Sequence, residues 1–166
     1  PISIYVSISA GKPNKCSSTK IPIDWSGCNL YGKVLTNIDL RMAKLKNANL
    51  HGASLQNKDL SGADLSHAIL KNANLDGADL SGADLSHSSM IDAKIRNANL
   101  SDAKFRYAKL YRTDFTKSNL SNVDFTGATL SDANLSFANL RGANLEHAGT
   151  WATNLNQCKN HPICEK

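Results

Sequence analysis

A single word of five residues is repeated through most of the chain. Residues 78–82 read Ala-Asp-Leu-Ser-Gly, and residues 83–87 read Ala-Asp-Leu-Ser-His. An aliphatic or aromatic residue occupies every position divisible by five from Leu30 to Leu145, 24 in succession without an insertion. The residue two positions earlier is usually Ala, and the residue between them is often Asp or Asn. Because self-similarity at a fixed period indicates a repeat architecture, this period constrains the fold more than any other feature.

Neither regular secondary structure explains a period of five. Five residues advance an α-helix by about 500°, so the leucines would be spread around the helix instead of along one face. In a straight strand, an odd step would send successive leucines to opposite faces. The backbone is therefore expected to turn a corner within each word, so that each word forms one side of a coil. The Ala and Leu positions then point inward, and the other three point outward.

A weaker rhythm indicates how many words complete one coil. His67, His87 and His147 are separated by multiples of 20. Asp occurs eight times directly before a central residue. With four words per coil these positions would fall into four columns spaced by 20 residues, and seven of the eight Asp residues fall into two of them. Both observations favour four words per coil.

The word A(D/N)LXX, present here as residues 78–82, resembles the repeat of pentapeptide-repeat proteins. The resemblance covers Ile23 to about Gln157, which is 27 words with centres from 25 to 155. It implies an all-β fold, a right-handed, four-sided parallel β-solenoid of about seven coils with Leu or Phe and Ala stacked inside. With coils about 4.8 Å apart, the rod would be about 32 Å long. A disordered tract would have no reason to keep an apolar residue at one phase.

The chain is expected to be one repeat domain between two short caps. The predicted boundaries are an N-terminal cap at 1–22, the solenoid at 23–157 and a C-terminal cap at 158–166. The open ends of a solenoid expose strand edges and apolar side chains, which must be covered. Apolar residues alternate with polar ones over residues 2–9, which predicts an edge strand in the N-terminal cap.

Two lysines conflict with this pattern of inward and outward positions. Lys33 and Lys58 stand where Ala should point inward. Since a buried unpaired ammonium group is costly, both side chains are expected to escape outward. Lys58 lies deeper in the rod, and a local distortion is expected there.

The four cysteines lie at the two ends of the repeat. Cys28 and Cys158 occupy inward positions, but they would be about 31 Å apart, against a limit of roughly 7 Å between bonded Cα atoms. We therefore predict the disulfides Cys16–Cys28 and Cys158–Cys164, each fastening a flank over an open end. Two alternatives stay open: free thiols, and zinc at the C-terminus, where Cys158, His161 and Cys164 offer three ligands, one fewer than a structural site normally has.

The cysteines also bear on the compartment. An even number of cysteines in the flanks favours an oxidising environment. The sequence contains no transmembrane run and no signal peptide, but it begins with Pro1 and not with Met, so a removed leader is compatible with it. Some relatives in cyanobacteria and plants occupy the periplasm or the thylakoid lumen, and the resemblance implies an exported protein of that type.

Positive charge is concentrated in the middle of the chain. The whole chain carries +5, and segment 94–117 contains seven basic residues against two acidic ones. We call these seven residues the basic belt: Lys94, Arg96, Lys104, Arg106, Lys109, Arg112 and Lys117. In a four-sided coil the belt reaches three sides. It is a candidate site for phosphates, an anionic membrane surface, nucleic acid or an acidic partner, unless its charges only keep the rod soluble.

No catalytic site, small-molecule substrate or cofactor is expected. The sequence has no phosphate-binding glycine motif, no H-E-x-x-H and no nucleophile elbow. An interior filled with Leu and Ala also leaves no concave pocket. His67, His87 and Tyr107 fall in one outward column and form a candidate exposed ladder. For this ladder, metal binding, pH sensing and simple solvation stay open.

The function favoured by these observations is that of a structural or protein-interaction rod with an unidentified protein partner. One outward column offers apolar anchors, namely Tyr31, Ile91, Tyr111 and Trp151, and Phe137 lies on the adjacent side. The alternative is an anion- or nucleic-acid-binding module that uses the basic belt. The resemblance also raises protection of DNA gyrase by mimicry of DNA. Such mimics are acidic, however, and a pI of about 9.1 has the wrong sign.

Overall fold

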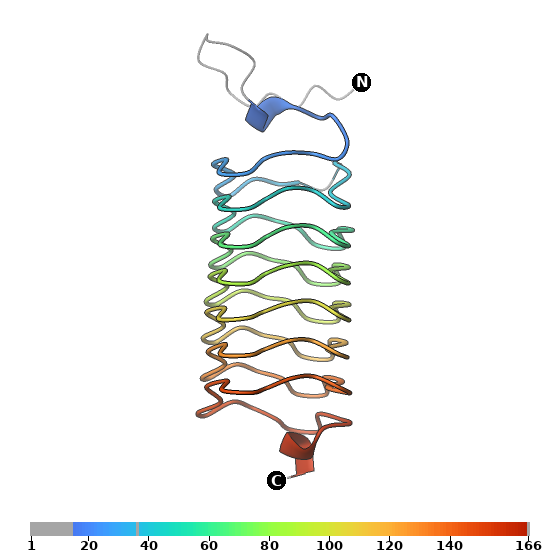
Figure 1. The fold of residues 1–166 in the computed structure, drawn as a ribbon, viewed down its shortest axis with the longest axis vertical. Coiled ribbons are helices and arrows are strands. Elements are labelled where there is room, and N and C mark those ends of the chain that lie inside the picture. Colours follow the sequence, from blue (N-terminus) through green and yellow to red (C-terminus); the bar gives the residue numbers. More distant parts are fainter. Residues whose placement is uncertain (1–14, 36, 166) are drawn as a thin grey trace.

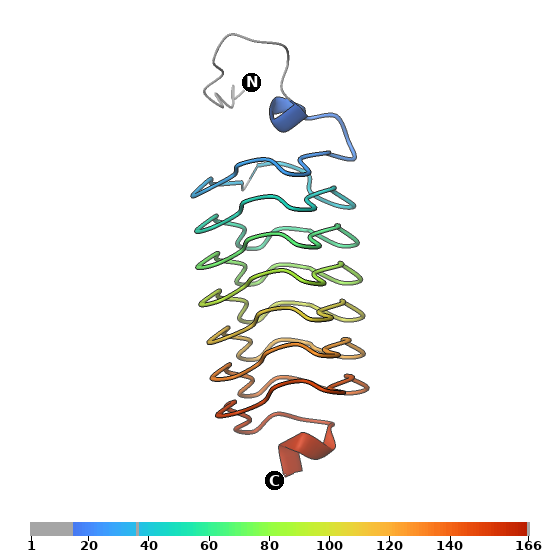
Figure 2. The same ribbon diagram turned by 60° about the vertical axis from the view of Figure 1, so that its left-hand side comes forward.

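The computed structural model describes residues 15–35 and 37–165, which form one stack of coils (Figures 1 and 2). Parallel bridges join residues that are 20 positions apart, as in Asp64↔Asp84 and Asp84↔Lys104. One column of bridged residues passes through seven coils: Asp24, Lys44, Asp64, Asp84, Lys104, Asp124 and Asn144. The four-sided parallel solenoid predicted from the repeat is therefore confirmed. The edge strand predicted for residues 2–9 lies outside the described residues.

Each side of a coil is held to its neighbours by a short ladder. The Leu65 N–H donates to the Asp84 carbonyl (2.7 Å), and the Asp84 N–H donates to the Ala63 carbonyl (2.9 Å). The corner then closes when the Ala68 N–H donates to the Leu65 carbonyl (3.0 Å). The third residue of every such corner from Met42 to Gln157 has φ between 53° and 70°. This left-handed conformation bends the chain about once per word, which explains the period of five.

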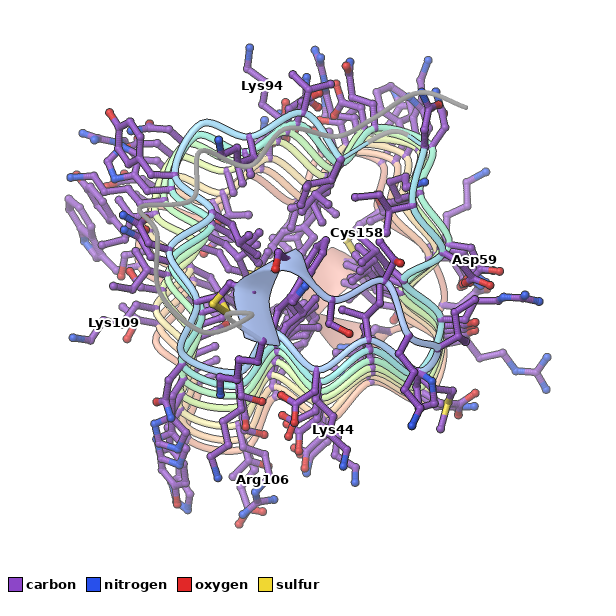
Figure 3. The ribbon with its side chains drawn as sticks, turned by 90° about the horizontal axis from the view of Figure 1, so that it is seen from above. Lys44, Asp59, Lys94, Arg106, Lys109 and Cys158 are labelled. Atoms are coloured by element: carbon purple, nitrogen blue, oxygen red, sulfur yellow. A yellow bond between two sulfur atoms is a disulfide. The ribbon has the colours of Figure 1, made fainter. Side chains whose placement is uncertain are left out.

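The interior is a solid column. The Leu and Ala positions point inward along the rod, and most of these side chains are completely buried. Viewed from above, the coils form a square outline with the polar side chains projecting from it (Figure 3). Phe105, Phe115 and Phe125 pack together in the lower half, with ring centroids 5.4 to 6.1 Å apart.

The two lysines at inward positions do not become buried. Lys33 is exposed and Lys58 is half-buried. At Lys58 the ladder continues, because its carbonyl accepts the Asp79 N–H (2.8 Å) and Asp59 bridges Asp79. The ladder is interrupted on the other side of this word, where Asp59 makes no bridge with Asp39 of the coil above in the described part of the chain. The local distortion expected at Lys58 therefore lies beside it, between its coil and the preceding one.

A short 3-10 helix and a disulfide cover the N-terminal end of the described rod. The helix η1 spans Lys15–Ser17. Cys16 is bonded to Cys28 in the first coil, with 5.6 Å between their Cα atoms. Just below, the Trp25 indole N–H donates to the Ser18 carbonyl (3.0 Å), which ties the segment after η1 to the core.

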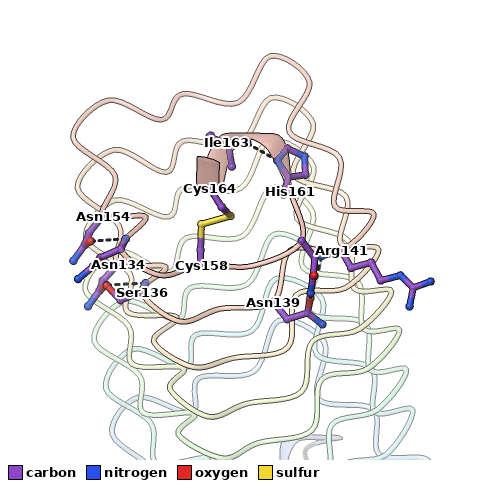
Figure 4. The surroundings of a disulfide bond; sticks show 11 residues. Asn134, Ser136, Asn139, Arg141, Asn154, Cys158, His161, Ile163 and Cys164 are labelled. Atoms are coloured by element: carbon purple, nitrogen blue, oxygen red, sulfur yellow. Dashed lines mark hydrogen bonds between the residues drawn. A yellow bond between two sulfur atoms is a disulfide. The ribbon is translucent and has the colours of Figure 1, made fainter. Parts of the chain in front are cut away.

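The C-terminal end has a similar cover (Figure 4). The 3-10 helix η2 spans Pro162–Glu165, and Cys164 within it is bonded to Cys158 of the last coil, with Cα atoms 5.4 Å apart. Ile163 packs against the core, and its N–H donates to Nδ1 of His161 (3.2 Å). Leu155 in the last coil stays half-buried, so the cover is partial.

Candidate interaction surface

The four sides of the rod differ in chemistry, and we name them after residues labelled in Figure 3: the Lys44, Lys109, Lys94 and Asp59 sides. Each side presents two outward columns, the bridged residue and the residue just after the word centre. On the Lys109 side the bridged column is Asn29, Asn49, Ile69, Ser89, Lys109, Thr129 and Gly149. The second column of this side is Tyr31, His51, Lys71, Ile91, Tyr111, Ser131 and Trp151.

The Lys109 side carries the largest exposed apolar side chains. Trp151 is 76% exposed, Tyr31 60% and Tyr111 37%, while Ile69 beside this column is also exposed. Tyr31, Tyr111 and Trp151 face outward because each directly follows a word centre, which is one of the three outward positions of the word. Ile91 is half-buried in the same column. Phe137, exposed as well, lies at the corner of the adjacent Lys94 side, as the sequence predicted.

Two of these aromatic rings are held by neighbours. The Tyr31 ring lies 5.0 Å from that of His51 one coil below. The Arg112 guanidinium lies 4.7 Å from the centre of the Tyr111 ring and also binds the Asp92 carboxylate. Tyr111 is therefore oriented by a cation that is itself fixed, which lowers the entropy lost if a partner covers it.

The candidate ladder occupies the corner between the Lys44 and Lys109 sides. The rings of His67 and His87 are parallel within 7° and 4.8 Å apart, and Tyr107 follows at 5.3 Å. Arg106 lies 5.9 Å from the centre of the Tyr107 ring. Among residues 15–35 and 37–165, no group of three or more His, Cys, Asp or Glu side chains is arranged to hold a metal ion. A metal or pH role for the ladder stays a prediction.

The arginines of the basic belt are bound by carboxylates from adjacent coils. The three short ion pairs are Arg96–Asp76 (2.5 Å), Arg106–Asp124 (2.8 Å) and Arg112–Asp92 (2.6 Å). The hydrogen bonds from Arg112 hold the pKa of Asp92 below its ordinary value. The belt does reach three sides. A ligand anion, however, would have to compete with these carboxylates for the guanidinium groups of the belt.

The lysines of the belt differ from its arginines. All four are exposed, and none forms a salt bridge with a residue in the described ranges: Lys94, Lys104, Lys109 and Lys117. They lie on the Lys94, Lys44 and Lys109 sides. Any attraction of the belt for anions therefore rests mainly on lysines that are distributed around the rod and not gathered on one face.

The zinc alternative at the C-terminus does not fit the structure. Cys158 and Cys164 are bonded to each other, so neither can supply a thiolate. His161 is left as one potential ligand, and its Nδ1 already accepts the Ile163 N–H.

One surface depression lies at the N-terminal end, with a volume of about 540 Å³. It is lined by Ile21, Pro22, Asp39, Arg41, Met42 and Ser61. Arg41, its one guanidinium group, binds both oxygens of Asp39 and lowers the pKa of that carboxyl to about 2. The cation is thus neutralised within the protein, and the depression presents mainly the apolar side chains of Ile21 and Met42.

Sequence reasoning missed a ladder of side-chain amides on the Asp59 side. The Asn99 amide donates to Asp79 (3.2 Å), Asn119 donates to Asn99 (3.1 Å) and Asn139 donates to Asn119 (3.2 Å). Their oxygens also accept backbone N–H groups two residues on, as Asn119 does from Ser121. The preference for Asp or Asn before each word centre was the available signal. The ladder makes this side polar, and its side-chain amides form hydrogen bonds with one another and with the backbone.

Comparisons with known proteins agree with the geometry. A family model described as pentapeptide repeats matches in eight copies, over residues 26–57, 59–97, 83–122 and 118–148. No curated protein sequence matches at a significant level. HetL of the cyanobacterium Nostoc sp. strain PCC 7120, a pentapeptide repeat protein involved in heterocyst differentiation regulation, is 31% identical with a TM-score of 0.71. The match covers 81% of this chain and 60% of HetL, so the chain spans about three fifths of that relative.

A second solved structure is similar over a comparable length. QnrB1, a plasmid-mediated fluoroquinolone resistance protein, is 25% identical with a TM-score of 0.56, and the match covers 78% of this chain and 71% of QnrB1. In the part of the chain that is described, neither helix has the length and apolar character required to cross a bilayer. The repeat, the parallel four-sided ladder and these matches give one conclusion: the chain belongs to the pentapeptide-repeat family and has its right-handed quadrilateral β-solenoid fold.

Proposed function

We propose that the chain is a non-catalytic rod that presents the Lys109 side to a protein partner. The observation that carries this proposal is the column of exposed aromatic residues, in which Trp151 is 76% and Tyr31 60% exposed. Trp, Tyr and Arg are the residues most enriched at the energetic centres of protein interfaces. The filled interior supports the same function, because a substrate site requires a concave pocket and a column of buried Leu and Ala provides none.

Site-specific photo-crosslinking tests this proposal. A benzophenone amino acid is placed at Trp151, and in a matched protein at Ser101 on the opposite, polar Asp59 side. Both proteins are exposed to an extract of the native compartment. The expected result is one discrete protein adduct from position 151, retained at roughly 0.5 M salt, and none from position 101. Equal labelling from both positions would contradict the proposal.

The compartment belongs to the proposal as well. We place the protein in an oxidising space, the periplasm or the thylakoid lumen. The two disulfides, Cys16–Cys28 and Cys158–Cys164, support this address, since structural disulfides persist mainly outside reducing compartments. Fractionation of native cells, with a non-reducing mass measurement on the purified protein, tests it. Four missing hydrogens in an exported fraction are expected, whereas four free thiols in a cytosolic fraction would contradict it.

Anion binding by the basic belt is the second candidate. It is favoured by the four exposed belt lysines that lack a salt bridge in the described ranges. Neutralising Lys94, Lys104 and Lys117 should then abolish retention on heparin, and the retention should fall steeply with salt. Retention that is unchanged by these substitutions would leave the belt as a solubilising feature.

A further inference from the structure

The Lys109 side differs from the other three sides in having no carboxylate. None of the 14 residues in its two outward columns is Asp or Glu. The corresponding columns of the other sides all contain them: Asp24, Asp64, Asp84, Asp124 and Glu146 on the Lys44 side, Asp76 and Asp114 on the Lys94 side, and Asp39, Asp59 and Asp79 on the Asp59 side. The corner that leads into the Lys109 side also lacks carboxylates, since it carries the ladder of His67, His87 and Tyr107.

Cationic and apolar groups alternate on this side. Lys71 lies beside the exposed Ile69, and Lys109 lies beside Tyr111. Neither lysine forms a salt bridge with a residue of the described ranges. At the following corner, Asp92 forms its short ion pair with Arg112, and its interaction with Lys71 is a weaker electrostatic attraction without a salt bridge. The side therefore presents two ammonium groups without a short ion pair between apolar anchors, on a rigid ladder.

We infer that the Lys109 side binds an acidic polypeptide segment in which carboxylates alternate with apolar side chains. This inference rests on the proposed function and specifies the partner's chemistry. The carboxylates would meet Lys71 and Lys109, and the apolar side chains would cover Ile91, Tyr111 and Trp151. Complementary charge at the edge of an interface fixes partner choice and register, while buried aromatic anchors supply most of the affinity.

The same side is a poor match for other anionic surfaces. Binding to a nucleic acid draws its affinity from many phosphate contacts, and adsorption to an anionic membrane needs a cluster of about four to eight Lys or Arg residues. Lys71 and Lys109 are the only Lys or Arg residues among the 14 residues of the two outward columns of the Lys109 side. Their exposed isoleucine, tyrosine and tryptophan side chains instead resemble the centre of a protein interface.

Peptide selection on the whole chain tests the inference. A random peptide library is selected against the immobilised protein, and the affinities of the selected peptides are measured against two charge-reversed variants. Lys71→Glu/Lys109→Glu alters the proposed side. Lys44→Glu/Lys46→Glu is the matched control, with the same change in net charge at exposed positions on the Lys44 side. We expect selected peptides to be acidic with interspersed apolar residues, and to lose at least about tenfold in affinity on the first variant alone.

Three outcomes would overturn the inference, and they separate it from the proposed function. Neutral or basic peptides that lose affinity with Trp151→Ala but not with Lys71→Glu/Lys109→Glu would leave the interaction rod standing and remove the acidic partner. Equal losses on both charge-reversed variants, or equally tight binding of duplex DNA or of phosphatidylglycerol vesicles, would mean undirected attraction of anions. Selection of no peptide on this side would contradict both the inference and the proposed function.

Discussion

The ring of Tyr107 lies over the backbone of Gly127 one coil below. A Cβ atom added at Gly127 would come within 2.6 Å of both Cδ1 and Cε1 of this ring. Tyr107 also stacks on His87 above, at 5.3 Å between ring centroids. The glycine therefore provides the space that lets the corner column of His67, His87 and Tyr107 continue its stack.

Gly127→Ala should destabilise the protein more than Gly82→Ala. Both glycines have positive φ, at 66° and 64°, so an alanine at either position costs about 1 kcal/mol of unfolding free energy. At Gly82 the added Cβ meets nothing within 4 Å, whereas at Gly127 it must displace Tyr107. We expect an additional loss of up to about 1 kcal/mol, as the contact with His87 is lost. Urea unfolding of both variants measures the difference.

A double-mutant cycle provides the control for this prediction. In the background Tyr107→Ala, the additional loss at Gly127 should disappear, and the cost of Gly127→Ala should equal that of Gly82→Ala. A cost at Gly127 that is the same with and without the Tyr107 ring would show that the ring makes no energetic contact with this glycine.

Removing the hydroxyl of Ser88 should stabilise the rod. Ser88 stands at an inward position usually held by Ala, is completely buried, and its Oγ has no hydrogen-bond partner in the described part of the chain. A buried hydroxyl without a partner costs about 1 to 3 kcal/mol. We expect Ser88→Ala to raise the free energy of unfolding by about 1 kcal/mol, measured by urea denaturation.

Ser118 is the matched control, because it is also a buried serine at an inward position. Its Oγ donates to the Ile95 carbonyl and accepts the Ala98 N–H (3.2 Å). Ser118→Ala should therefore lower the free energy of unfolding by about 1 kcal/mol or more. If both substitutions changed stability in the same direction, hydrogen bonding would not be what distinguishes the two sites.

The core could be predicted from sequence because it follows one rule along the chain. The dry interior requires an apolar side chain at the centre of every word, so the position of Leu65 and Phe105 in the repeat is enough to assign them to the core. A corner within each word was expected, but its left-handed conformation was not predicted. His67 and Asn72 adopt φ of 59° and 57°, and the preference of this position for Gly, Asn, Asp and His was the signal, since these residues tolerate the left-handed conformation best.

The three short ion pairs of the belt could not be predicted from segment 94–117 alone, because their acidic partners lie outside it. Asp76 is 20 residues before Arg96 and becomes its neighbour only when the coils stack. The net charge of a sequence window therefore overstated the free charge of the belt. The irregularity beside Lys58 likewise involves a residue 20 positions away from its neighbour, because the bridge that is missing in the described ranges is the one between Asp39 and Asp59.

Acid should weaken the rod through its paired carboxylates. Arg112 holds the pKa of Asp92 below its ordinary value of 3.8, and Arg41 lowers that of Asp39 to about 2. A carboxyl whose pKa is lower in the folded state adds stability that is complete above the unfolded value and is lost as pH falls through the folded one. Thermal unfolding should thus shift to lower temperature between about pH 4 and pH 2.

Asp92→Asn isolates one of these contributions. The variant should be less stable than the parent at pH 7, and the difference should shrink as pH falls through the lowered pKa of Asp92 and its carboxylate becomes protonated in the parent. Asp132→Asn is the control, since Asp132 lies in the same corner column and forms no salt bridge with any described residue. A difference between Asp92→Asn and the parent that stays constant with pH would contradict the assigned role of the Arg112 pair.

The two disulfides should contribute unequally to stability. Cys16–Cys28 closes a span of 12 residues and Cys158–Cys164 a span of 6. Cross-linking stabilises mainly by restricting the unfolded chain, and this effect grows with the logarithm of loop length, so the longer loop should contribute about 0.6 kcal/mol more. Replacing each pair by serines and measuring urea unfolding tests this difference. If the C-terminal pair cost more, the packing of η2 against the core through Ile163, and not chain entropy, would be the dominant contribution of that bond.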